Sequence, residues 1–394
     1  MVREVVVVSA VRTAIGTLGG SLKDVPPVEL GALVVRESLA RAGVEGRDVG
    51  HVVFGHVVNT EPRDMYLSRV AAIQGGCAED TPAYNVNRLC GSGLQAVVSA
   101  AQSILLGDCD VAIGGGAENM SRAPFASLDA RWGARMGDTR MVDMMTGALH
   151  DPFHKIHMGV TAENIAARWG ITREEQDRLA VESHQRAQRA TEAGYFKDQI
   201  VPVTLKTRKG ELAWASDEHF RPNATMEDMA RLKPVFQKEN GTVTAGNASG
   251  INDAAAAVVL MDAATAQARG LKPLARLVAY AHAGVDPKYM GIGPVPASLA
   301  ALRKSGLSVQ DLDVIEANEA FAAQACAVTR DLGLDPAKVN VNGGAIAIGH
   351  PIGASGARVL TTLLYEMQKR DAKKGLATLC IGGGMGIALC VERD

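Results

Sequence analysis

The chain has 394 residues, of which 47% are hydrophobic and 21% charged, and its formal net charge is −2. This length suffices for two or three domains with sizeable cores. The near-zero charge excludes a global field that attracts nucleic acid or an acidic membrane, so neither is expected as a partner. The longest apolar block, Ala254–Met261, is too short for a membrane span, and we expect none.

The first elements predict an alternation of strands and helices. Val5–Val8 is too short for a signal-peptide core and predicts a buried first strand. Val28–Ala42 has helical periodicity and ends at Gly43, and the apolar stretch Val49–Phe54 follows.

Cys90 lies in the motif N-R-L-C-G-S-G-L, directly before a helical stretch that Gly107 ends. A helix N-terminus lowers the pKa of a thiol from about 8.5, so this position favours an activated nucleophile. An ordinary buried cysteine is the alternative. A strand over Asp110–Ile113 is then expected to enter a turn at Gly114–Gly116.

Residues 121–244 differ in composition from the rest of the chain, because they are rich in histidine, methionine and charged residues. We interpret them as an insertion that covers the site. Thr172 and Glu175 have the spacing of a capping box for a helix over Thr172–Ala193. His157 taken alone has a structural histidine as its alternative. Arg221 is a candidate phosphate contact.

Asn318 and His350 are polar side chains on two later turns. Asn318 begins N-E-A-F-A after a strand, where it can hold a water or a carbonyl, or simply form a turn. His350 lies in G-H-P-I-G-A-S-G before a helix, where it can take the proton of a thiol or instead serve as a cap.

Cys380 ends the predicted strand Leu376–Cys380 and precedes Gly382–Gly384. A thiolate here can remove a proton alpha to a thioester, while backbone amides stabilise the oxyanion. A plain glycine turn is the alternative. The six cysteines include no C-x-x-C pair, so we expect reduced thiols, no zinc site and a cytoplasmic location.

The two ends of the chain repeat each other. Gly43 and Gly306 stand 263 positions apart (306 − 43), and the same offset relates Ser92 and Gly93 to Ser355 and Gly356. This repeat predicts two pseudo-symmetric α/β halves with mostly parallel sheets and helices on both faces. Ligands should bind at the strand C-termini and helix N-termini.

Taken together, the motifs C-G-S-G, N-E-A-F-A, G-H-P-I-G-A-S-G and C-I-G-G-G-M-G resemble those of the thiolase family over essentially the whole chain. Gly241–Asn252 and Met290–Pro296 look most like bacterial biosynthetic β-ketothiolases. The resemblance implies a five-layered α/β/α/β/α fold and a homotetramer. The expected organisation is an N-terminal half (1–120 with about 245–268), an inserted CoA-binding loop domain (121–244) and a C-terminal half (269–394).

The resemblance also implies a ping-pong Claisen condensation of coenzyme A thioesters, without a tightly bound cofactor or a metal. Cys90 would take the acyl group, activated by His350, and Cys380 would deprotonate acetyl-CoA. Asn318, through a water, and His350 would form one oxyanion hole. The amides of Cys90 and Gly382 would form the other. The implied CoA contacts are His157, Met158, Arg221, Ala245, Gly246, Ser249 and Phe321.

Three other functions are open to a chain of this kind. A degradative 3-ketoacyl-CoA thiolase would use the same site on longer chains. A decarboxylating ketoacyl synthase would carry a second histidine in place of Cys380. A non-enzymatic acyl-CoA-binding protein would lack one of Cys90, His350 and Cys380, and this chain has all three.

Overall fold

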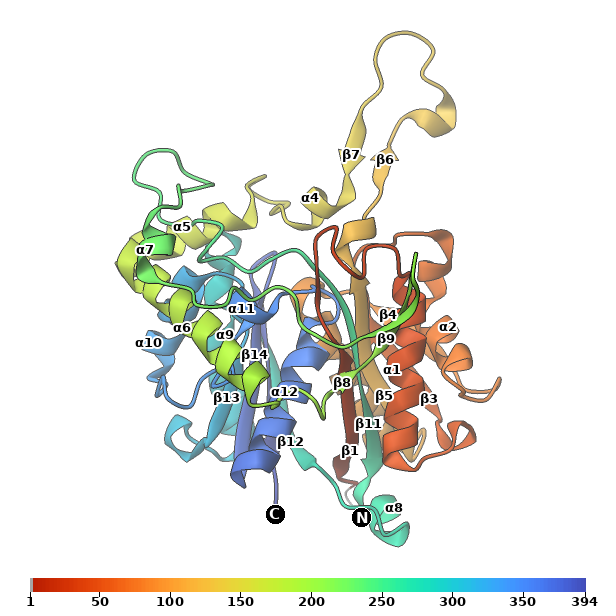
Figure 1. Ribbon diagram of the computed structural model, residues 1–394. Helices are drawn as coiled ribbons and strands as arrows, with labels where there is room; N and C mark the ends of the chain where they lie inside the picture. Colours follow the sequence, from red (N-terminus) through yellow and green to blue (C-terminus); the bar gives the residue numbers. More distant parts are fainter. Residues whose placement is uncertain (1–2) are drawn as a thin grey trace.

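The computed structural model describes residues 3–394 and centres on a mixed sheet of eleven strands. Its main path runs β13-β14-β15-β12-β1-β11-β5-β3-β4, with β2 beside β11 and β8 beside β1. Val6 and Val7 of β1 pair with Arg276 and Ala275 of β12, which joins the two halves of the chain. Figure 1 shows the halves side by side, with the termini close together at one end.

The strands have the following bounds: β1 Val5–Thr13, β2 Gly16–Thr17, β3 His51–Gly55, β4 Ala83–Val86, β5 Val111–Asn119, β6 Phe125–Ser127, β7 Met141–Asp143, β8 Ile200–Val201, β9 Val203–Thr207, β10 Gly210–Trp214, β11 Asn252–Asp262, β12 Ala275–Gly284, β13 Val314–Ala317, β14 Lys374–Ile381 and β15 Met385–Glu392. The α-helices are α1 Pro27–Ala42, α2 Leu67–Gln74, α3 Ser92–Leu106, α4 Met144–Ala148, α5 Met158–Trp169, α6 Arg173–Glu192, α7 Met226–Ala230, α8 Ala263–Ala268, α9 Pro294–Ser305, α10 Ala322–Leu332, α11 Ala345–Ile348 and α12 Ser355–Arg370.

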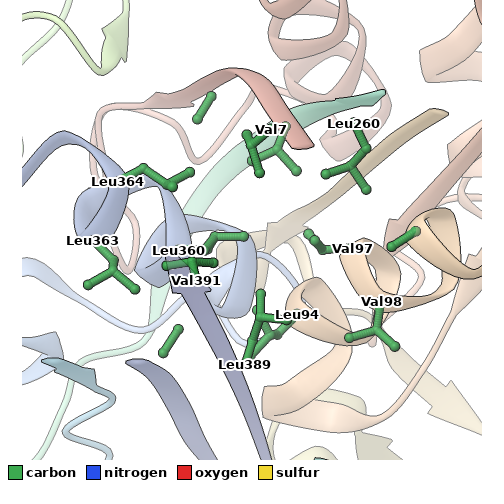
Figure 2. Close-up of a cluster of buried hydrophobic side chains, with 14 of the residues drawn as sticks. Val7, Leu94, Val97, Val98, Leu260, Leu360, Leu363, Leu364, Leu389 and Val391 are labelled. Atoms are coloured by element: carbon green, nitrogen blue, oxygen red, sulfur yellow. The ribbon is translucent and has the colours of Figure 1, made fainter. Parts of the chain in front are cut away.

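The first strand explains why helices cover both faces of the sheet. Val6 and Val8 pack in a cluster with α1 and α2, whereas Val5 and Val7 pack on the opposite face with α3 and α12. Side chains of a strand alternate between faces, so an all-apolar strand must be buried on both. Figure 2 shows the inner cluster, where side chains of α3 and α12 meet those of β1, β11 and β15.

The two halves of the sheet form two separate layers. The order of layers is α1/α2, the N-terminal half of the sheet, α3/α12, the C-terminal half of the sheet, and α9/α10, which cover the outer face of β13–β15. This confirms the expected five-layered arrangement. The repeat is also structural: α1 and α9 both end at a left-handed glycine, Gly43 at φ 62° and Gly306 at φ 71°. α3 and α12 then lead into the equivalent strands β5 and β14.

The expectation of mostly parallel sheets is wrong, because the strand directions are mixed. β3 lies parallel to β4 and β5, and β13 parallel to β14. However, β11 runs antiparallel to β1 and β5, and β15 antiparallel to β12 and β14. Only a short turn joins β14 to β15, and such a connection permits only antiparallel pairing.

The insertion contributes β6 to β10 and α4 to α7, and its assignment as a separate domain over 121–244 stays a prediction. The expected capping box is present, with Thr172 and Glu175 at the start of α6. The β6–β7 hairpin projects away from the body of the molecule (Figure 1). Its loop exposes Trp132 (85%) and Met136 (96%).

The expectation that no stretch could span a membrane needs correction. The segment Leu89–Leu106 is long and apolar enough by length and composition, with a mean hydropathy of 1.4. Two-thirds of it (67%) is buried inside the protein. It contains α3, whose apolar residues form part of the inner cluster between the two sheets. The position of α3 in the core accounts for its apolar character.

Gly114–Gly116 was expected to form a turn, but the three glycines lie inside β5. A Cβ on Gly114 would lie 2.6 Å from the Val97 Cα, and one on Gly116 would lie 2.2 Å from the Gly353 carbonyl oxygen. The glycines are there because α3 and the loop of His350 approach the strand backbone too closely for side chains. In sequence these three glycines look like Gly382–Gly384, so the sequence alone did not distinguish close packing from a turn.

We therefore expect Gly116→Ala to destabilise the protein by about 1–3 kcal/mol, because the added methyl group meets a rigid backbone carbonyl. A lowered thermal unfolding midpoint would show this. Gly147→Ala is the matched control, since a Cβ at that helical position has no neighbour within 4 Å. Equal midpoints for the two variants would contradict the packing argument.

Candidate active site

Two glycines bring the nucleophile loop and the histidine loop together. A Cβ on Gly93 at the start of α3 would lie 2.7 Å from the Ala357 nitrogen, and one on Gly356 would lie 2.1 Å from the Leu94 nitrogen. The first turns of α3 and α12 thus touch backbone to backbone. Cys90 immediately precedes α3, and His350 lies five residues before Ser355, so both face the same end of the sheet.

A cavity of about 550 Å³ opens at this end. Nine of the twelve predicted site residues line it: Cys90, His157, Met158, Arg221, Ala245, Ser249, Phe321, His350 and Gly382. They come from both halves of the chain and from the insertion. All three predicted segments therefore contribute residues to the cavity wall.

The other three predicted residues, Cys380, Asn318 and Gly246, do not line this cavity. Gly246 is buried, and a Cβ there would meet Leu232 and Met229. Cys380 is fully buried in a cluster that includes Met158 and Phe321, two of the residues on the cavity wall. Cys380 thus lies one layer behind the wall rather than on it.

Cys90 lies in the short helical turn Leu89–Gly91, which leads directly into α3. Burial raises the pKa of the Cys90 thiol to about 11, an effect that the nearby backbone of Gly382 and Cys90 offsets only in part, although the residue as a whole is partly exposed. In the resting protein the thiol is therefore protonated and needs a base.

Ser355 fixes the tautomer of His350. The Ser355 hydroxyl donates to the Pro351 carbonyl at 2.8 Å, and its oxygen lies 2.6 Å from His350 Nδ1. A hydroxyl has one proton, so Nδ1–H must be the donor in the second bond. Nε2 then carries a free lone pair and has no hydrogen-bond partner in the part of the chain that the structure describes. The ring is arranged to accept a proton at Nε2.

His350 is also held in its neutral form. It is buried, and burial followed by the positive charge of Arg358 lowers the pKa of His350 to about 3. Its backbone amide donates to Asn252 Oδ1 at 2.8 Å. The resting pair is consequently a neutral thiol and a neutral imidazole, not an ion pair.

Asn318 follows β13 as predicted and is 2% exposed. Its Nδ2 atom is a buried donor without a partner, like Nε2 of His350. Buried polar atoms are normally hydrogen-bonded, so two such open atoms identify where a substrate or water would bind.

Burial raises the pKa of the Cys380 thiol, and the neighbouring Cys90 raises it further. Cys380 is the penultimate residue of β14 and lies two positions before Gly382, which lines the same cavity as Cys90. That the two sulfurs act on one substrate stays a prediction.

At the wider part of the cavity, His157 caps α5 by accepting from the Gly159 amide at 3.0 Å. Its ring stacks on Phe236 at 4.6 Å between centroids. Burial lowers the pKa of His157, so its ring is neutral. Both the structural and the binding interpretations of His157 are therefore compatible with its position.

Several site residues were missed from the sequence. Ser355 stands within the quoted histidine motif, and Asn252 within Gly241–Asn252, but their bonds to His350 need coordinates to be seen. Phe236 has no motif around it at all. Glu118 is buried behind the site and accepts from the amides of Val57, Val58 and Gly353.

No group of three or more potential metal ligands occurs among residues 3–394. The cavity wall is mostly apolar, and its basic side chains are those of Arg221, His157, His219 and His350.

Comparisons with known proteins cover nearly the whole chain. The family model described as thiolase, N-terminal domain, matches residues 5–264, and thiolase, C-terminal domain, matches residues 271–393. The beta-ketothiolase BktB of Cupriavidus necator is 70% identical over 393 residues, covering 100% of both chains.

Solved structures agree. The Bacillus anthracis acetyl-CoA acetyltransferase superposes with a TM-score of 0.97 at 48% identity, covering 99% of both chains. Human mitochondrial 3-ketoacyl-CoA thiolase in complex with CoA superposes with a TM-score of 0.96 at 43% identity, covering 100% of this chain and 98% of that one.

Removing the bond that orients His350 should slow proton transfer from Cys90. We expect Ser355→Ala to reduce the reactivity of Cys90 toward a thioester by about tenfold to a hundredfold, as for other groups that orient a reactive histidine. Rapid-quench intact-protein mass spectrometry measures this rate. Ser38→Ala is the matched control, because Ser38 is equally buried and also donates to a carbonyl. Equal rates in both variants would remove Ser355 from the site.

The raised pKa of Cys90 predicts a pH dependence of its alkylation. Only the thiolate reacts, so the rate with iodoacetamide should rise about tenfold per pH unit between about pH 6 and 9 and level off only toward pH 11. Peptide-resolved mass spectrometry follows Cys90 separately from the other cysteines. A rate that is already constant from pH 6 upward would instead indicate a thiolate–imidazolium pair.

Proposed function

The chain belongs to the thiolase family, and we propose that it is a biosynthetic β-ketothiolase that condenses acetyl-CoA with a short acyl-CoA through an acyl-cysteine. The observation that carries the proposal is the free Nε2 of His350 in the same cavity as Cys90 and Gly382. This arrangement provides a nucleophile, its base and an amide donor in one place.

In the first half-reaction, His350 Nε2 takes the proton of Cys90, and the thiolate attacks the acyl-CoA carbonyl. The backbone amides of Cys90 and Gly382, two residues that line the cavity, stabilise the tetrahedral oxyanion. The carbon–sulfur bond to coenzyme A breaks, and the leaving thiolate takes the Cys380 proton. The products are acyl-Cys90, free CoA, a Cys380 thiolate and an imidazolium at His350.

In the second half-reaction, the Cys380 thiolate removes a proton from the methyl group of acetyl-CoA. The enolate oxygen is stabilised by the Nε2–H of His350 and, through a water, by Asn318. The enolate carbon attacks acyl-Cys90, and the released Cys90 thiolate recovers its proton from His350. The cycle closes with all three groups neutral, and the opposite charges of its middle state stabilise each other.

The remaining predicted contacts belong to coenzyme A. Arg221, Ala245 and Ser249 line the cavity with His157, Met158 and Phe321, and we assign them to its pantetheine and phosphate groups. Gly246 lies behind this wall and acts only through the backbone of its neighbours. We also propose a cytoplasmic location and a homotetramer, and the exposed Trp132 and Met136 of the projecting hairpin loop support a contact between copies of the chain.

A degradative 3-ketoacyl-CoA thiolase remains the second candidate, because the human mitochondrial 3-ketoacyl-CoA thiolase superposes closely on this chain. A Cβ on Gly382 would lie 3.0 Å from Met158 Cε and 3.1 Å from Leu89 Cδ1, so these two side chains pack directly against the Gly382 turn. Thiolysis kinetics with 3-ketoacyl-CoA substrates of increasing length separate the two. A kcat/KM that rises with chain length would favour the degradative enzyme.

We expect Cys90→Ala to abolish the acyl-enzyme formed from acetyl-CoA, as measured by intact-protein mass, because no other thiol lines the cavity among residues 3–394. Cys77→Ala is the control, since Cys77 is buried in the outer cluster beneath α1 and α2. An acylated mass that persists in Cys90→Ala would refute the nucleophile assignment.

Cys380→Ser should still acylate, because the departing CoA thiolate can be protonated by water. Condensation should fall by about two to four orders of magnitude, the usual loss on removing a general base. Cys390→Ser is the control, because Cys390 is equally buried on the adjacent strand β15. Coupled assays of each half-reaction measure both rates, and near-normal condensation would move the base elsewhere.

A further inference from the structure

Arg358 is a fully buried cation directly behind the site. It lies on the first turn of α12, three residues after Ser355, and its side chain is 1% exposed. Its Nη2 atom lies 3.5 Å from Asn318 Oδ1, and its Nη1 atom lies 3.9 Å from Glu316 Oε2. Neither Nε nor Nη1 has a hydrogen-bond partner among residues 3–394.

A buried arginine so poorly paired is costly. Removing a cation from water costs several kcal/mol, which a carboxylate offsets only when the geometry is good. The separation from Glu316 is too long for a hydrogen bond. By contrast, the equally buried Arg12 makes two bonds of 2.8 Å to Asp217. The packing of α12 alone does not account for a charge at position 358.

The position of the Arg358 guanidinium beside Asn318 indicates what the buried charge does. A guanidinium carries only donors, so it can face only the oxygen of the Asn318 amide. The amide is thereby prevented from flipping, and Nδ2 is left as the open donor. The same positive charge contributes to lowering the pKa of His350, so it acts on both groups that would bind the enolate oxygen.

We propose that Arg358 is a positioning residue for the condensation step: it fixes the amide of Asn318 so that Nδ2 points toward the enolate oxygen, while Ser355 on the same helical turn fixes His350. This role rests on the proposed function, because that enolate arises only when the carbon–carbon bond of the proposed reaction is formed or broken. Glu316 does not neutralise Arg358 fully, because burial raises the pKa of the Glu316 carboxyl to about 8.

A double-mutant cycle tests the role. Arg358→Met should lower the condensation rate by about tenfold to a hundredfold, somewhat less than the loss of an oxyanion donor, and should change acylation of Cys90 less than threefold. In an Asn318→Ala background, Arg358→Met should lower the condensation rate by less than about twofold, because the amide that Arg358 orients is already absent. Arg358→Lys, which retains a donor-only cation, should recover part of the rate.

Arg12→Met is the structural control, and it should affect both half-reactions equally while lowering the thermal unfolding midpoint. If Arg358→Met does not fold, the cycle is run with Arg358→Lys, which retains the charge. Equal losses with and without Asn318, or equal losses in both half-reactions, would overturn the positioning role. The proposed function is tested separately on the unsubstituted protein. If that protein forms no acyl-Cys90 or catalyses no condensation, the proposed function itself is wrong, whatever the Arg358 variants show.

Discussion

The contact between Gly93 and Gly356 is the constraint on which the rest of the site depends. Each glycine lies where a Cβ would meet the backbone of the other helix, so α3 and α12 begin side by side. The nucleophile precedes one helix and the base precedes the other. Two reactive groups some 260 residues apart (350 − 90) are therefore positioned by backbone contact, which is more rigid than side-chain packing.

The internal repeat let much of the fold be predicted. A constant offset identified both helix starts, both helix ends at Gly43 and Gly306, and the placement of Cys90 and His350 at the same end of the sheet. Strand direction was not predictable in this way, because β11 pairs with β1 and β5, and β15 with β12, through contacts distant in sequence. Gly114–Gly116 were misinterpreted because a glycine required by a close neighbour looks the same in sequence as one required by a turn.

The site itself was predictable wherever a motif carries the reactive atom, and not where a residue acts through another. Ser355 and Arg358 take no part in bond making or breaking. The role of Ser355 follows from the single proton of its hydroxyl, and that of Arg358 from the orientation of the Asn318 side-chain amide. Phe236, which stacks on His157, comes from a stretch without any pattern. Chemistry leaves a local signature in a sequence, whereas orientation arises only when separate segments pack together.

The position of Cys380 behind the wall formed by Met158 and Phe321 has a consequence for selectivity. Of these two cysteines, only Cys90 borders the open space. An electrophilic inhibitor delivered on a pantetheine-like arm would therefore meet the Cys90 sulfur before it met that of Cys380. The protein thus holds its proposed base deeper than its nucleophile, where a reagent must pass the first sulfur to reach the second.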